Sequence, residues 1–194
     1  MSRLASLALL ATLSACAGSV GADPRTPSGP AVSTSEMRKG TDGADHALVA
    51  PGAKLTVIEF FSHHCPCQEA HDPRLRELAK SYGPRGVAFY AVDSEAGATI
   101  ERDQKESAAR GYPYPVLIDV GGKLARSLGA TYATYTIVLD AQGRLLYGGG
   151  IDTDKSHLTE GATPYLKNAL DEALASGKVE TSHTEAFGCA LTLE

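Results

Sequence analysis

The segment at residues 54–61 constrains the fold more than any other part of the chain. It reads Lys-Leu-Thr-Val-Ile-Glu-Phe-Phe, a β-branched and aromatic run that is typical of a largely buried strand. Cys65-Pro66-Cys67 follows after a three-residue loop, and Pro66 suits the first position of a helix, where its missing N–H costs nothing. Apolar residues at helical spacing then predict a helix to about residue 82, before Gly83-Pro84. A buried strand therefore leads directly into a helix whose first turn carries two cysteines.

The remaining patterns complete an alternation of strands and helices. We expect strands at residues 86–92, 112–119, 136–139 and 144–147, and helices at residues 97–110, 123–128 and 163–176. This order predicts an α/β sandwich with a mixed sheet. The expected folded domain covers residues 46–176, and a mobile tail at 177–194 carries Cys189 with an unperturbed thiol.

The N-terminal residues indicate a secreted protein. Residues 1–15 combine a short positive start with an apolar run of about ten residues, too short to span a bilayer but right for a secretory signal. The run ends in Leu13-Ser14-Ala15-Cys16, which resembles the bacterial lipobox. Lipidation of Cys16 would give a membrane-anchored, periplasm-facing lipoprotein of the cell envelope, and Ala17 in place of Asp indicates the outer membrane. The alternative is an ordinary signal peptide cleaved near Ala15 or Ala22.

Composition restricts the compartment and the partners. Residues 16–45 are rich in Gly, Ser, Pro, Thr and Ala, which predicts a flexible tether. The net charge of -5 shows no excess of basic residues, so no nucleic acid is expected as a partner. An oxidising compartment lets disulfides persist. Of the four cysteines, three remain after lipidation of Cys16, so one stays unpaired in a fully oxidised monomer.

The chemistry centres on Cys65. Free N–H groups at a helix start stabilise an anion, and the thiolate is the reactive form of cysteine; the alternative is a buried structural cysteine. Protonated His63 and His64 would favour that thiolate. A second interpretation is a metal site, in which His63 and His64 bind copper(I) or zinc together with Cys65, Cys67 and His71. The third interpretation is that both histidines simply line an exposed loop.

These features resemble a known family. Phe60-Phe-Ser-His-His-Cys65-Pro66, the helix proline at residue 73 and the later strands are similar to the thioredoxin-fold redoxins, the AhpC/TSA and TlpA-like proteins, over residues 46–176. The resemblance implies a thioredoxin-like three-layer sandwich with a central mixed β-sheet flanked by helices. It also implies thiol-disulfide exchange with a partner protein that carries thiols or a disulfide, without a cofactor.

The cysteine spacing departs from the family pattern. Pro73 sets a register in which Cys65 matches the nucleophile and Gln68 stands where the resolving cysteine is expected, with Cys67 one position early. Residues 184–191 resemble the Gly-Cys ending of one secreted redoxin subgroup, so either Cys67 or Cys189 could resolve the mixed disulfide.

Other departures concern supporting residues. Ser62 matches the threonine of the peroxiredoxin pattern, but Ile58 replaces its proline, and the expected arginine is absent. Thr134 stands in place of the fold's cis-proline, so a trans bond is expected, because a cis bond before a non-proline residue costs about 3 kcal/mol. A peroxiredoxin-like peroxidase and a copper(I)-binding module remain the alternative functions.

Overall fold

The computed structural model describes residues 31–194. The predicted signal peptide, Cys16 and the first half of the predicted tether therefore lie outside the described residues. Within residues 31–194, no helix combines the length and the apolar character needed to cross a membrane.

A five-stranded mixed sheet forms the centre of the domain, in the order β5-β4-β3-β6-β7. The strands are β3 (Leu55–Phe61), β4 (Val87–Asp93), β5 (Val116–Ile118), β6 (Thr136–Asp140) and β7 (Leu145–Gly149). β3 pairs in parallel with β4 and antiparallel with β6. The apolar run at residues 54–61 is thus a central strand, as predicted, and every residue of β3 is buried.

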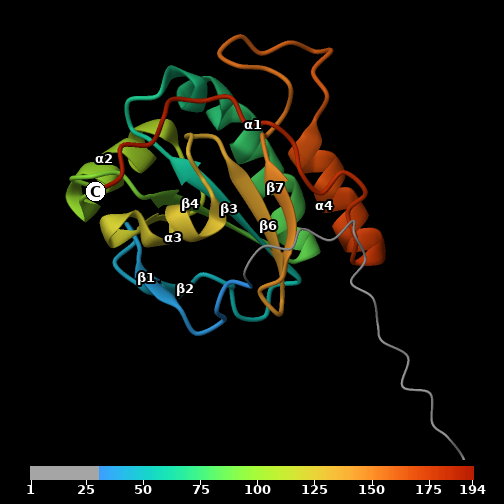
Figure 1. Cartoon of the computed structure of the whole chain (residues 1–194), viewed down its shortest axis with the longest axis horizontal. Coiled ribbons are helices and arrows are strands. Elements are labelled where there is room, and N and C mark those ends of the chain that lie inside the picture. The colour runs from blue at the N-terminus through green and yellow to red at the C-terminus, as the bar shows by residue number, and fades with distance from the viewer. Residues whose placement is uncertain (1–30) are drawn as a thin grey trace, which may run out of the picture.

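Helices cover both faces of this sheet (Figure 1). They are α1 (Pro66–Tyr82), α2 (Ile100–Arg110), α3 (Lys123–Leu128) and α4 (Tyr165–Ser176), with short 3-10 turns at Gly83–Arg85 and Val120–Gly122. Side chains alternate along β3, so Val57 and Phe61 pack in the core beneath α1 and α4. Phe60 faces the opposite core with Leu124 of α3. The three-layer α/β sandwich predicted from the sequence is confirmed.

The boundary predicted at residue 45 is wrong on the N-terminal side. Residues 37–47 form a hairpin of β1 (Met37–Lys39) and β2 (Asp45–Ala47), which composition did not indicate. The turn of this hairpin covers the edge strand β5: the Thr41 N–H donates to the Val116 carbonyl at 2.9 Å, and the Val116 N–H donates to Thr41 Oγ1 at 3.1 Å. An exposed sheet edge leaves backbone N–H and carbonyl groups without hydrogen-bond partners. Thr41 provides these partners for Val116 of β5.

The tail after α4 also folds onto the domain, against the expectation of a mobile segment. It runs back across the top of the domain towards α2, drawn in red in Figure 1. The Gly148 N–H of β7 donates to the Ser182 carbonyl at 3.0 Å, and Tyr132 forms an antiparallel bridge with Ala190. The tail therefore brings Cys189 back to the start of α1.

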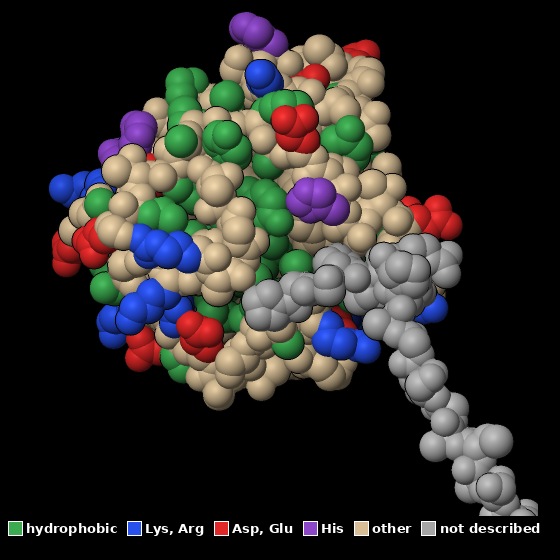
Figure 2. All heavy atoms as spheres, in the orientation of Figure 1, with side chains coloured by type: hydrophobic (Ala, Val, Ile, Leu, Met, Phe, Trp, Pro, Cys, Tyr) green, Lys and Arg blue, Asp and Glu red, His purple; other side chains and the backbone are tan. Residues whose placement is uncertain are grey.

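The face of the described residues in Figure 2 carries mixed charge. Lys and Arg side chains lie among Asp and Glu, and hydrophobic side chains are exposed between them. Charges of one sign do not gather into a single large patch on this face.

Candidate functional site

Cys65 lies at the junction of β3 and α1, where the sequence predicted it. It is the N-cap of α1, with an extended backbone (φ -88°, ψ 114°) and Pro66 at the helix start. Its carbonyl accepts the first helical hydrogen bond, from the Glu69 N–H at 3.1 Å. The residue is only 1% exposed. The thiol therefore lies at the positive end of a helix dipole, in a largely desolvated position.

The structure brings all three described cysteines together as free thiols. The Cys189 N–H donates to Cys65 Sγ at 3.2 Å. Partial burial, followed by the charge of Cys65 and contact with its sulfur, raises the pKa of Cys67. Partial burial, contact with Cys65 and the charges around it raise the pKa of Cys189 to about 12. The expectation of an unperturbed Cys189 is wrong, because burial and the contact with Cys65 oppose ionisation of its thiol.

Close backbone packing holds the tail beside Cys65. The Ala133 N–H donates to the Cys189 carbonyl at 2.9 Å. A Cβ atom at Gly188 would lie 1.9 Å from the Ala133 carbonyl oxygen, so only glycine permits this approach. The Thr134 Oγ1 donates to the Phe187 carbonyl at 3.0 Å. The loop before β6 thus forms the surface on which the tail docks.

Thr134 adopts an unusual backbone conformation in this loop. Its φ is 70°, in the left-handed region that is costly for a β-branched residue. Its N–H donates to the Phe60 carbonyl at 2.9 Å. No cis peptide bond occurs among residues 31–194, so the bond before Thr134 is trans, as expected. Strain at this position persists because hydrogen bonds to β3 and to the tail stabilise it.

Glu59 is a buried acid in the middle of β3, and sequence reasoning did not select it. It is 1% exposed, and neither carboxylate oxygen has a hydrogen-bond partner in the described part of the chain. Burial raises its pKa well above 4.5, and the charges of Asp72 and Cys65 raise it further. Glu59 therefore keeps its proton to higher pH than a solvated carboxyl does, and its pKa responds to the charge on Cys65. The sequence feature that could have identified Glu59 is its position as the one acidic residue within a predicted buried strand.

A cluster of hydrogen-bonded polar side chains fixes the loop that precedes Cys65. The Tyr112 hydroxyl donates to Asp72 Oδ1 at 2.5 Å and accepts a bond from Gln68 Nε2 at 3.1 Å. Arg110 donates to Asp72 Oδ2 at 3.0 Å and to the His63 carbonyl at 2.7 Å. Charged hydrogen bonds of this kind are stronger than neutral ones. The end of α2 thereby holds both α1 and the loop at residues 62–64.

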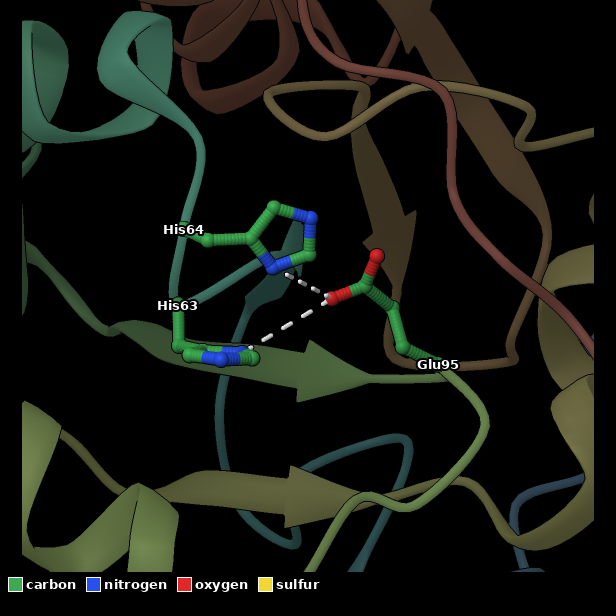
Figure 3. A group of neighbouring side chains, drawn as sticks. All are labelled: His63, His64 and Glu95. Carbon is green, nitrogen blue, oxygen red and sulfur yellow. Dashed lines mark ion pairs between the residues drawn. The ribbon is translucent and has the colours of Figure 1, made fainter.

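His63 and His64 face Glu95, which follows β4 (Figure 3). Burial, the charge of Arg102 and the charge of His64 lower the pKa of His63. This lowered pKa works against the positive charge that His63 would need to favour the Cys65 thiolate. The buried Ser62 hydroxyl lies 3.4 Å from His64 Nδ1.

His71 lies apart from the other two histidines. Its Nδ1–H donates to the Cys67 carbonyl at 2.7 Å, and Nε2 lies 3.2 Å from Asp152 Oδ1. Both ring nitrogens are thus engaged, so His71 does not join the ligand set predicted for copper(I) or zinc. Within residues 31–194, the gathered metal-type group is His63, His64 and Glu95, without a cysteine.

Comparison with known proteins agrees with this architecture. The family model described as Redoxin matches residues 27–160. The chain belongs to the redoxin family. This redoxin is 30% identical over 129 residues to the thiol:disulfide interchange protein CycY of Rhizobium leguminosarum bv. viciae, which covers 63% of this chain and 63% of that relative. It thus spans less than two thirds of the relative's length.

Solved structures share the fold of this redoxin. A hypothetical protein from Sinorhizobium meliloti 1021 superposes with a TM-score of 0.76 at 24% identity, over 86% of this chain and 94% of that one. An uncharacterized conserved protein from Geobacillus kaustophilus gives 0.74 at 24% identity, over 87% and 95%. The Redoxin match ends at residue 160, so Cys189 comes from a segment beyond it.

Proposed function

We propose that this redoxin is a thiol-disulfide oxidoreductase in which Cys65 is the nucleophile and Cys189 the resolving cysteine. The observation that carries the proposal is the 3.2 Å hydrogen bond from the Cys189 N–H to Cys65 Sγ at the start of α1. Membership of the redoxin family and the similarity to a thiol:disulfide interchange protein support the activity.

Helix geometry favours Cys189 over Cys67 as the partner of Cys65. Both Cys67 and Cys189 contact the Cys65 sulfur, but a bridge between Cys65 and Cys67 would close a ring over only one intervening residue at a helix start, which strains the disulfide and the backbone. Cys189 instead reaches Cys65 from a separate segment that the loop before β6 holds in place. The bridge from Cys65 to Cys189 therefore avoids the strain of closing a ring within one helical turn.

The charges around Cys65 favour an ordered reaction. The Cys65 thiolate attacks one sulfur of a partner's disulfide, forms a mixed disulfide and releases one partner thiolate. This step removes the negative charge that helped to raise the pKa values of Cys189 and Glu59. The released thiolate takes its proton from solvent, and Cys189 becomes easier to ionise.

The second step completes the transfer of electrons. Cys189 loses its proton to solvent and attacks Cys65 Sγ, which forms the Cys65–Cys189 disulfide and releases the second partner thiolate. The partner gains two electrons, and the redoxin loses two. A dithiol protein that reduces the new disulfide closes the cycle, and the reverse sequence would oxidise a partner dithiol.

Single cysteine variants test these roles with a disulfide-linked peptide as substrate. Cys65→Ser should abolish exchange, and Cys189→Ser should accumulate a mixed disulfide between Cys65 and the peptide. Cys67→Ser should retain turnover and is the matched control. Trapping by Cys67→Ser together with normal turnover by Cys189→Ser would reverse the assignment.

We further propose that the redoxin acts in the cell envelope as a lipoprotein anchored through Cys16. The support is the resemblance of Leu13-Ser14-Ala15-Cys16 to a lipobox after a short apolar run. Such a location would keep the three thiols where disulfides form and persist.

A further inference from the structure

Two imidazoles and one carboxylate converge beside the predicted redox site (Figure 3). Glu95 Oε2 lies 3.7 Å from His64 Nδ1 and 4.0 Å from His63 Nδ1. The three donor atoms all lie within 4.8 Å of one another. The histidines follow β3 and the glutamate follows β4, and the two strands are parallel neighbours. Their carboxyl ends meet at one edge of the sheet, so the fold itself gathers these side chains.

Two inner atoms of this group lack hydrogen-bond partners. The Glu95 side chain is only 3% exposed, and neither Glu95 Oε2 nor His63 Nδ1 has a hydrogen-bond partner in the described part of the chain. The other carboxylate oxygen, Oε1, accepts the Thr192 N–H at 3.4 Å, which turns Oε2 towards the imidazoles. A buried carboxylate oxygen without a partner is costly. A bound cation would provide the interaction that is missing.

We propose that His63, His64 and Glu95 form a binding site for a divalent cation of the zinc type. Two imidazole nitrogens and one carboxylate oxygen are a ligand set that zinc accepts, with bonds of about 2.0–2.2 Å and a water molecule in the fourth position. The distances of 3.7 Å and 4.0 Å from Glu95 to the histidines need only small side-chain rotations to reach such bonds. The His64 side chain is 56% exposed, which leaves a path for the ion and for the water.

The surrounding contacts hold this ligand set in place. Arg110 fixes the His63 backbone through its carbonyl at 2.7 Å, and the tail fixes Glu95 through Thr192. Partners that orient the ligands are a regular feature of metal sites. The site uses no cysteine, so it differs from the copper(I) set expected from the sequence.

Zinc titration with a competing chromophoric chelator tests the proposal on the reduced full chain. We expect one Zn²⁺ per chain, and the same stoichiometry and affinity in a variant that carries Cys65→Ser, Cys67→Ser and Cys189→Ser together. Glu95→Gln keeps the shape of the side chain but removes its charge. It should weaken zinc binding by at least about 100-fold. Loss of a residue that only orients a ligand already lowers metal affinity by about 10–100-fold, and Glu95 is itself a proposed ligand.

Two further variants keep the test decisive if Glu95→Gln proves unstable. His64→Gln changes a half-exposed side chain and should cause a similar loss of affinity, whereas His157→Gln, at an exposed loop position, should change nothing. The Co²⁺-loaded protein should lack the charge-transfer absorption of thiolate ligands. The proposal is overturned if no stoichiometric binding occurs, or if binding survives Glu95→Gln and His64→Gln but disappears without the cysteines.

Discussion

Replacing Gly188 by alanine should separate Cys189 from Cys65 while leaving both thiols in the protein. The new Cβ would lie 1.9 Å from the Ala133 carbonyl oxygen, far inside any permitted contact. The new Cβ is attached directly to the tail backbone, and the Ala133 oxygen belongs to the backbone of the loop before β6. Neither atom can turn aside, so the tail has to move by more than an ångström. The substitution therefore tests the docked tail without altering a reactive group.

The magnitude follows from the hydrogen bonds that this movement breaks. The Ala133 N–H donates to the Cys189 carbonyl and the Leu191 N–H donates to the Thr131 carbonyl, both at 2.9 Å. At about 1 kcal/mol for each such bond, their loss together with the contact to Cys65 Sγ disfavours docking by about 2–3 kcal/mol. Since about 1.4 kcal/mol corresponds to a factor of ten, we expect closure of the Cys65–Cys189 disulfide to slow by roughly 30–140-fold.

The assay follows disulfide closure directly. Reduced protein carrying Cys67→Ser is mixed with oxidised glutathione, samples are quenched with an alkylating agent, and the closed form is counted by mass. Gly161→Ala is the matched control, because a Cβ at Gly161 meets no atom within 4 Å. A Gly188→Ala protein that closes as fast as the control would refute the role assigned to the docked tail.

Three further predictions concern Glu59, Cys16 and the absence of peroxidase activity. Folded Glu59 keeps its proton above pH 4.5 whereas the unfolded chain loses it, so the free energy of unfolding should fall as pH rises above that value. Glu59→Gln should therefore match the wild type near about pH 4 and exceed its stability near about pH 8 in urea titrations; equal stability at both pH values would count against the buried acid. Cys16→Ser should leave the membrane fraction on sedimentation, and a variant that still sediments would rule out the lipid anchor. With Ile58 where peroxiredoxins carry proline, hydrogen peroxide should disappear no faster with the wild type than with Cys65→Ser, and rapid consumption by the wild type alone would indicate a peroxidase.

The central part of the fold could be predicted because its signals are local. The strand at residues 54–61 and the helix after Cys65 show their periodicity within single segments, and each was found where it was predicted. Glu59 carried a local signal too, as the one acid within the buried strand. Its meaning depended on the charges of Asp72 and Cys65, which act on it only once α1 has packed against β3.

The parts that sequence reasoning missed depend on contacts between distant segments. The hairpin at residues 37–47 and the C-terminal tail have polar or mixed composition, and both are ordered by backbone bonds to β5 or β7. Glu95 meets His63 only because β3 and β4 are parallel neighbours. Neither composition nor periodicity reports such pairings, so the tail was predicted to be mobile and Glu95 was not selected.

Mass-spectrometric mapping of the disulfide in the oxidised wild-type protein tests the central claim most directly. The protein is oxidised, digested without reduction and searched for cross-linked peptides, with the free cysteine identified by alkylation. We predict a Cys65–Cys189 bridge and a free Cys67. A Cys65–Cys67 bridge with Cys189 free would contradict it.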